Sequence, residues 1–374
     1  MKLYSLQLED FRSHNYLLFK PSSSVNLILG KNGAGKTNLL EAMAFLGNAK
    51  GFRAQKKEEL VSFDAPFFRL SAIYDNDRMD HRSHVEVAVH RKGSMRLKYN
   101  GAQEKNLYNL PERLLSVVFT PDDLSLIKEG PQIRRNFLDK DLLMIQPHLR
   151  GLRLHYEKNL SQRAKLLKEA RYKPLSKEVM ESYDLSLARS GVGLLKGRFH
   201  LLSLMVPEAR KIHRYLAPES GELDATYQSS LGQIRGLDEE TLEHLFLKSL
   251  YQRRREEILR GTTLCGPHRD DLILYLNQKP ARLYASQGQQ RTIVLALKLA
   301  MVEAMAKIVE KRPILLLDDV FSELDKKRRE ALLEYIKESQ TQGFITATDM
   351  ADNELKSHHI TTFTLNEGKI IQEK

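Results

Sequence analysis

The feature that most constrains this chain is the run GKNGAGKTN at residues 30–38. It fits the P-loop pattern G-x-x-x-x-G-K-[ST], with the glycines, the lysine and the threonine at the fixed positions. A strand-like apolar run at 25–29 precedes it, and apolar residues at helical spacing follow it at 38–46. This order of strand, loop and helix predicts an α/β nucleotide-binding domain and argues against a chance glycine-rich turn.

The chemistry expected of such a loop is phosphate binding. Glycines allow backbone conformations that are closed to other residues, so several N–H groups can converge on phosphate oxygens, and the helix N-terminus adds partial positive charge. We expect Lys36 to reach the β- and γ-phosphates and the Thr37 hydroxyl to hold Mg²⁺. The nucleotide-binding residues predicted are Gly30, Lys31, Asn32, Gly33, Ala34, Gly35, Lys36, Thr37 and Asn38.

Composition sets the class of protein. The 374 residues allow two or three domains, or one domain that carries a large insertion. The net charge of +11 indicates a polyanionic partner such as nucleic acid, although a generally basic surface gives the same charge. Cys265 is the only cysteine, so no internal disulfide can form and we expect a reducing cytoplasm. No apolar run approaches the roughly 18–20 residues of a membrane span, and the early acidic residues do not fit a secretory signal.

Strand patterns dominate the early part of the chain. The predicted strands are at 3–9, 16–19, 68–74, 84–90, 95–99 and 116–119. An Asn-Gly turn at 100–101 makes the later ones an antiparallel meander. A short helix is expected at 111–115.

Basic residues lie on either side of the P-loop. Arg12 comes just before the P-loop strand and either faces the nucleotide or is an ordinary surface residue. A basic loop follows the P-loop helix, and its residues Arg53, Lys56 and Lys57 are candidate DNA contacts; a merely solvated loop is the alternative.

Helix patterns replace strand patterns from about residue 123 to 260. An apolar stripe at 149–167 predicts a helix whose other faces carry charges that include Arg163, and we interpret the stripe as intramolecular core, too short for a dimerising coiled coil. A second helix is expected from about 177 to 204. Pro207, three residues further on, ends this helix or offsets its last turn. A turn-rich piece follows at 217–236, and Asp238 is a predicted N-cap for a third helix.

The expected organisation is therefore a nucleotide-binding domain with an inserted helical arm. The boundaries predicted are 1–122 for the first half of the head, 123–260 for the arm and 261–374 for the second half of the head. His268 lies near Asp270 and Asp271, but no metal-ligand spacing supports a metal site there.

A second phosphate-binding element is predicted at 286–290, which opens a helix that runs to 309. Its hydroxyl, its glycine N–H and its helix N-terminus suit an anion. One nucleotide does not need two complete phosphate-binding helix N-termini from the same subunit. We therefore expect a dimer in which this loop covers the γ-phosphate of the partner's nucleotide. An N-capped helix without a ligand is the alternative. The residues are Ser286, Gln287, Gly288, Gln289 and Gln290.

A Walker B element is predicted at 313–319, where an apolar strand ends in two acids. Asp318 would hold Mg²⁺, and Asp319 would orient or deprotonate the attacking water. The alternative role, helix caps only, leaves the apolar run unexplained. The loop that follows, with Ser322 and Asp325, could cross a dimer seam, and 343–349 reads as one more strand with a polar end near the γ-phosphate.

These motifs in this order resemble the ABC-type ATPase head. Three further stretches resemble the RecF family of bacterial recombination mediators: Gly130-Pro131 with residues 134–139, residues 162–168, and residues 266–271. The likeness spans nearly the whole chain. It implies an α/β fold, an ABC-type P-loop head of mixed sheet and antiparallel meander with an inserted, mostly α-helical arm. That fold is related to the heads of SMC and Rad50 proteins but lacks their long coiled coil.

The resemblance also implies roles for residues. ATP binds at 30–38, with Lys36 and Asp319 catalytic and Thr37 and Asp318 on Mg²⁺. Residues 286–290 are the signature that acts on the partner's nucleotide, and Ser322 to Asp325 form the D-loop.

The activity that the resemblance implies is ATP-dependent homodimerisation on double-stranded, gapped or junction DNA, with slow DNA-stimulated ATP hydrolysis. The expected partners are RecR, and RecO in the wider pathway. The expected outcome is loading of RecA at single-stranded gaps coated by SSB, in the cytoplasm at the nucleoid, within recombination, replication and the SOS response.

The sequence departs from the wider ABC pattern in four places. The signature is SQGQQ in place of LSGGQ, Asp319 stands where transporters usually carry Glu, Thr348-Asp349 stand where a switch histidine is common, and no glutamine follows the strand at 117–119. Slow turnover is therefore expected. The alternatives left open are the ATPase subunit of a membrane transporter and a scaffold that uses ATP only as a structural ligand.

Overall fold

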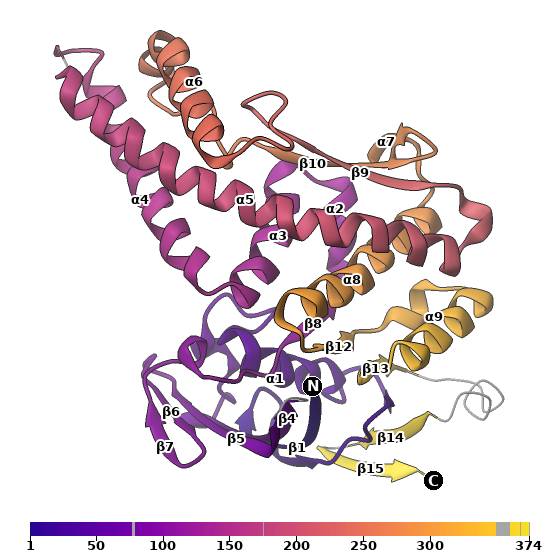
Figure 1. Cartoon of the computed structure of the whole chain (residues 1–374). Helices are drawn as coiled ribbons and strands as arrows, with labels where there is room; N and C mark the ends of the chain where they lie inside the picture. The colour runs from indigo at the N-terminus through magenta and orange to yellow at the C-terminus, as the bar shows by residue number, and fades with distance from the viewer. Residues whose placement is uncertain (77–78, 175, 349–359, 367, 374) are drawn as a thin grey trace. The chain divides into compact units, whose positions relative to one another are not determined.

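The computed structural model of the chain describes residues 1–76, 79–174, 176–348, 360–366 and 368–373 (Figure 1). The chain divides into two compact units. The head unit comprises Met1–Leu124, Glu208–Gly221 and Ser286–Lys374, and the arm unit comprises Ser125–Pro207 and Glu222–Ala285. The expected start of the arm at 123 is close to this division. Residues 261–285, expected in the head, group with the helical unit, and residues 208–221 group with the head.

The head unit contains a six-stranded, mostly parallel sheet in the order β15-β14-β3-β13-β12-β8. Only β15 is antiparallel to its neighbour. The strands are β3 (Val25–Leu29), β8 (Ser116–Phe119), β12 (Ile314–Leu317), β13 (Gly343–Ala347), β14 (Thr361–Asn366) and β15 (Lys369–Glu373). Because β13 lies between β3 and β12, the carboxyl ends of the P-loop strand and the Walker B strand meet at one edge of the sheet.

Helices cover both faces of this sheet, as the apolar strands predict. Ile314 and Leu316 of β12 belong to the core that includes helix α1 (Lys36–Asn48). Leu315 and Leu317 are equally buried on the other face, where α8 (Gln287–Val309) and α9 (Lys326–Glu338) lie (Figure 1).

A second, antiparallel sheet packs on the other side of α1, in the order β2-β1-β4-β5-β6-β7. Its strands are β1 (Lys2–Phe11), β2 (His14–Phe19), β4 (Phe67–Asn76), β5 (Met79–His90), β6 (Met95–Tyr99) and β7 (Ala102–Glu104). Phe68 meets Phe45 of α1 and Phe11 of β1 edge to face, with ring centroids 5.4 and 5.1 Å apart. The meander is confirmed, and the Asn-Gly turn has positive φ at both residues, 48° and 84°. The short strand β7 was not predicted.

The helix expected at 111–115 is wrong, because these residues form no helix. Their backbone groups bond to distant parts of the head. Tyr74 donates its hydroxyl proton to the Glu112 carbonyl at 2.8 Å, and the Leu115 carbonyl accepts from the N–H of Ile314 at 2.9 Å. Tertiary pairing therefore overrides local helix propensity here. The short 3₁₀ turns of the head are η1 (Lys57–Leu60), η2 (Leu107–Asn109), η3 (Pro121–Leu124), η4 (Pro218–Ser220) and η5 (Val320–Glu323).

The arm unit is mostly helical with one small sheet. Its helices are α2 (Ser125–Lys128), α3 (Pro131–Ile145), α4 (His148–Glu169), the first part of α5 (Lys177–Leu216), α6 (Glu239–Arg260) and α7 (Ala281–Tyr284). Asp238 caps α6 as predicted and accepts from the Thr241 N–H at 2.8 Å. The sheet has the order β11-β10-β9, with β9 (Leu223–Gln228), β10 (Asp271–Leu276) and β11 (Lys279–Pro280). Strand β9 lies in the piece expected to be turns, and its pairing with β10 across the intervening α6 is a long-range contact that local pattern does not reveal.

Helix α5 is longer than the sequence predicts, because it continues past Pro207 to Leu216. The proline removes the N–H that would bond to the Ser203 carbonyl, but the following turns bury Ala209, Ile212 and Leu216. Apolar burial of those turns offsets the missing hydrogen bond.

Arg163 corrects the expectation for α4. The sequence places it on a charged outer face, whereas its side chain is fully buried. Its guanidinium donates to Asp184 at 2.8 Å, Glu257 at 2.6 Å and the Thr263 hydroxyl at 2.7 Å. A buried charge needs such partners, so these contacts join α4, α5 and α6 at one point.

The run at 266–271 is part of the same polar interior. Gly266 has φ of 114°, and an added Cβ would lie 2.4 Å from the Phe246 ring. Asp271 receives two hydrogen bonds from Arg134 at 2.7 and 2.8 Å, and Asp270 accepts from Tyr227 at 2.9 Å. Burial lowers the pKa of His268 to about 4, which favours the neutral ring. Within the described residues no group of three or more His, Cys, Asp or Glu could hold a metal ion.

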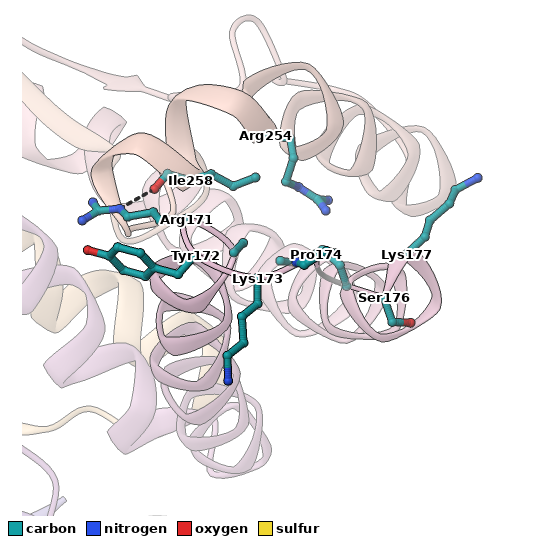
Figure 2. Close-up of a pocket in the computed structure, with 10 residues that line it drawn as sticks. Arg171, Tyr172, Lys173, Pro174, Ser176, Lys177, Arg254 and Ile258 are labelled. Atoms are coloured by element: carbon teal, nitrogen blue, oxygen red, sulfur yellow. Dashed lines mark hydrogen bonds between the residues drawn. The ribbon is translucent and has the colours of Figure 1, made fainter.

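A hollow of about 550 Å³ lies where α4 ends, α5 begins and α6 ends (Figure 2). Arg171 closes one side of it by donating to the Ile258 carbonyl at 2.8 Å. Lys173 and Pro174 line it, so the break predicted at these residues is the turn between α4 and α5.

Candidate nucleotide-binding site

The P-loop joins β3 to α1 with a backbone that glycine makes possible. Gly33 and Gly35 have φ of 84° and 97°, in the left-handed region that residues with a Cβ avoid. A Cβ at Gly30 would lie 2.5 Å from the Leu365 carbonyl oxygen of β14. The loop is therefore shaped by its glycines and held against the neighbouring strand.

Lys36 is turned into this loop. Its Nζ donates to the Gly30 carbonyl at 2.6 Å and the Lys31 carbonyl at 3.0 Å. Burial lowers the pKa of Lys36, and the carboxylates of Asp319 and Asp318 oppose that shift. The ammonium group thus lies against the loop carbonyls, within electrostatic range of both Walker B acids.

The P-loop and the Walker B strand are in direct contact. The Thr37 hydroxyl donates to Asp318 Oδ1 at 2.7 Å. Thr346, on the intervening β13, also donates its hydroxyl proton to Asp318 Oδ1, at 2.9 Å, and accepts from the Asp319 N–H at 2.9 Å. The polar strand end predicted at 343–349 therefore supports the two acids. Asp349 itself, expected at the switch-histidine position, lies outside the described residues.

Asp319 connects the site to the D-loop. It has φ of 50°, and the Ser322 hydroxyl donates to its Oδ2 at 3.0 Å and to its carbonyl at 2.8 Å. Asp325 caps α9 and accepts from the Arg328 N–H at 2.9 Å. Both residues predicted for the D-loop thus hold backbone or carboxylate groups in place.

Arg53 lies at this site, although the sequence suggested it as a DNA contact. Its guanidinium is 3.7 Å from Asp318 Oδ2. The backbone N–H of Arg53 donates to Glu41 Oε1 at 2.9 Å, and the Arg12 guanidinium donates to Glu41 Oε2 at 2.9 Å. Glu41 is a fully buried acid in α1. A glutamate inside the apolar run of that helix was the sequence signal that could have revealed the cluster of Glu41 with Arg12 and Arg53. Of the other basic residues proposed, Lys56 is exposed and Lys57 begins η1.

The signature residues form the tip of α8. The Ser286 hydroxyl accepts from the Gln289 N–H at 3.3 Å, and the Gln289 side chain accepts from the Ser286 N–H at 2.9 Å. This capping box satisfies the geometry of an ordinary N-cap. Ser286 and Gln287 are nevertheless exposed, whereas Gln290 is buried.

The donor set fits a magnesium nucleotide. A threonine hydroxyl and a carboxylate are oxygen ligands of the kind that Mg²⁺ prefers, and here Thr37 and Asp318 already lie 2.7 Å apart. The glycine loop and the Lys36 ammonium supply N–H donors for phosphate oxygens.

Comparison with known proteins decides the family. The family described as "RecF/RecN/SMC N terminal domain" matches residues 2–371. A protein described as DNA replication and repair protein RecF from Bacillus mycoides is 35% identical over 373 residues, 98% of each chain. One of the same description from Halalkalibacterium halodurans is 38% identical over 351 residues, 94% of this chain and 93% of that one. The chain belongs to the RecF family.

Solved structures agree with this family and fold. A structure described as the recombination mediator protein RecF with ATP in the RecFOR pathway has a TM-score of 0.86 and 30% identity, and the match covers 100% of this chain and 98% of that one. An Smc head bound to the C-winged helix domain of ScpA has a TM-score of 0.57 and 16% identity, which shows a shared fold alone. The predicted ABC-type head with a helical region is confirmed.

The RecF relatives do not favour the transporter alternative. In the part of the chain that the structure describes, no helix is long and apolar enough to cross a membrane.

Proposed function

We propose that this member of the RecF family is an ATP-dependent DNA-binding protein of replication and recombinational repair. ATP closes a homodimer on DNA, hydrolysis is slow, and the closed dimer works with RecR, and with RecO in the wider pathway, to help load RecA at single-stranded gaps. The relatives named DNA replication and repair protein RecF and the RecF structure with ATP support this proposal.

The observation that carries the proposal is the 2.7 Å hydrogen bond between Thr37 and Asp318. It brings the P-loop and Walker B, which are far apart in sequence, to one place at the carboxyl edge of the parallel sheet. Mg²⁺, when bound there, would neutralise charge on the phosphates.

The chain's own residues have separate tasks in this proposal. The loop N–H groups of residues 30–38 and the Lys36 ammonium bind and orient the triphosphate. Asp319 holds the attacking water and accepts its proton. Ser286 to Gln290, exposed at the tip of α8, cover the γ-phosphate of the partner subunit's nucleotide.

The DNA-binding part of the proposal draws on charge. The chain carries a net +11, and a basic protein releases counterions when it binds DNA. The preferred forms proposed are double-stranded, gapped and junction DNA. Lys56 and Lys57 remain candidate contacts, whereas the position of Arg53 beside Asp318 favours a role at the nucleotide.

The first test is Lys36→Met. Loss of the ammonium group should weaken ATP binding by at least about tenfold, or about 1.4 kcal/mol, and should remove ATP-stimulated retention of DNA. ATP binding is measured by fluorescence titration, and retention on a gapped duplex is measured by anisotropy with and without ATP.

Lys20→Met is the matched control, because Lys20 is an exposed lysine of the head unit that follows β2 outside the P-loop. It should behave as the wild type does. ATP-stimulated DNA retention by Lys36→Met at the wild-type level would contradict the proposal.

A further inference from the structure

Arg328 is a residue of the head unit that no motif singles out. It lies in the first turn of α9, directly after the D-loop. Its side chain is only 19% exposed, which is low for an arginine in the first turn of a surface helix. The groups that surround its guanidinium therefore determine how its charge is stabilised.

The guanidinium pairs with two segments that are far apart in sequence and lies next to a third. Nη1 lies 3.1 Å from Asp325 Oδ2 of the D-loop, and Nη2 donates to Glu219 Oε1 at 2.9 Å in η4, just after α5. A methyl group added at Gly288 of the signature would lie 3.6 Å from Nη1, so the guanidinium lies beside the signature, separated from Gly288 by about the width of a methyl group.

The ionisable groups around Arg328 come from the D-loop before α9 and from the end of α5 with η4. Asp325 and Glu219 offset its positive charge, and both carboxylates are 57% exposed. His213 of α5 is fully buried nearby. Burial, and next the Arg328 charge, lower the pKa of His213 to about 4, while Glu219 opposes this shift, so the imidazole is neutral and adds no charge next to Arg328.

This geometry has a consequence for the dimer. In the proposed dimer the signature of one subunit covers the partner's nucleotide, and the D-loop is expected to cross the same seam. Each is a loop at a helix N-terminus, and the planar Arg328 guanidinium pairs with Asp325 of the D-loop and lies next to Gly288 of the signature. Arginine suits such a place because its fork of donors is rigid and its charge is permanent.

We infer that Arg328 is a positioning residue that holds the signature tip and the D-loop in one arrangement, so that they engage the partner subunit as a single surface. Glu219 anchors the other side of the guanidinium. This inference rests on the proposed ATP-dependent dimer and adds the residue that prepares its surface.

The experiment compares Arg328→Gln and Glu219→Gln in the full chain. Arg328→Gln should raise the dimer dissociation constant in ATP by about tenfold, because the two loops are no longer held together. Glu219→Gln should act in the same direction but less, and the double variant should be no worse than Arg328→Gln alone, since both remove one interaction. Dimerisation is measured by sedimentation, and ATP binding is measured below the dimerisation range.

Two further readouts separate positioning from a merely structural role. The ATP affinity of the monomer and the thermal midpoint should stay close to wild type, because both carboxylate partners are solvated and remain so without the arginine. Lys327→Gln, at an exposed neighbour in the same turn, removes the same charge and should leave dimerisation unchanged.

Wild-type dimerisation by Arg328→Gln would overturn the inference, and so would a loss of monomer ATP affinity equal to the loss of dimerisation. If the wild-type chain itself fails to dimerise with ATP, the proposed function falls and this inference falls with it.

Discussion

Asp319 shows how a single residue is prepared for chemistry. Its left-handed backbone, with φ of 50°, costs a residue with a Cβ about 1 kcal/mol. Two neighbours hold it in this conformation, because Thr346 accepts from its N–H at 2.9 Å and Ser322 donates to its carboxylate at 3.0 Å. Strained backbone conformations that the surrounding contacts hold in place are characteristic of functional positions.

Asp319→Asn tests the role of that carboxylate. Asparagine also tolerates the left-handed conformation and keeps the shape of the side chain, so only the charge and basicity are removed. Loss of a general base should slow ATP hydrolysis by about a hundredfold to ten-thousandfold, while ATP binding stays unchanged. Phosphate release at saturating ATP gives the rate, and fluorescence titration gives the affinity.

Asp64→Asn is the control for this change, because Asp64 is an exposed acid of the head unit away from the site. Equal rates for Asp319→Asn and wild type would leave Asp319 without a chemical role and would favour the scaffold alternative.

Individual site residues differed in how far the sequence could predict them. The P-loop, Asp318 and Asp319 follow from local patterns, since their spacing and flanking strands are fixed by the backbone. Arg53 was predicted from its charge as a DNA contact, and the sequence does not reveal that it also lies beside Asp318, where its loop bonds to Glu41. Arg328 could not be found from sequence, since its role depends on segments brought together only by the tertiary fold.

At the scale of elements, α5 carries the feature most open to test. Pro207 lies inside a helix that continues to Leu216. Pro207→Ala would restore an N–H for the Ser203 carbonyl and remove the clash of the ring with the preceding turn. The free energy of unfolding should rise by about 1–3 kcal/mol, measured by urea denaturation followed by circular dichroism.

Ala209→Gly, two residues further along the same helix, serves as the opposite change and should lower stability, since Ala209 is buried and glycine is a poor helix former. A Pro207→Ala chain that is less stable than wild type would mean that the helix needs the geometry proline imposes.

Elements were predictable where their pattern is local. The strands of the meander, α4, the cap of α6 and the opening of α8 follow from alternation, helical spacing and capping residues. The failures share a cause in tertiary contacts. Residues 111–115 give their carbonyls to distant partners, β9 pairs with a strand beyond α6, and Arg163 finds buried acids on two other helices.

At the scale of the whole molecule, the parts of the nucleotide site divide into two groups. The P-loop and Walker B contact one another within one chain, through Thr37 and Asp318. The signature tip is open instead, with Ser286 and Gln287 exposed. A symmetric dimer would use the same tip twice and complete two equivalent sites, which is the natural closure for such an arrangement.

Ser286→Arg tests this closure. The long side chain would occupy the space that the partner's triphosphate needs, so ATP-dependent dimerisation should be lost while the monomer still binds ATP at its own P-loop. Loss of the N-cap costs about 1 kcal/mol of stability, and thermal unfolding measures that cost separately. Ser94→Arg makes the same change at an exposed serine of the head unit and should dimerise normally. A Ser286→Arg chain that dimerises in ATP with wild-type affinity would show that the tip of α8 takes no part in closing the site.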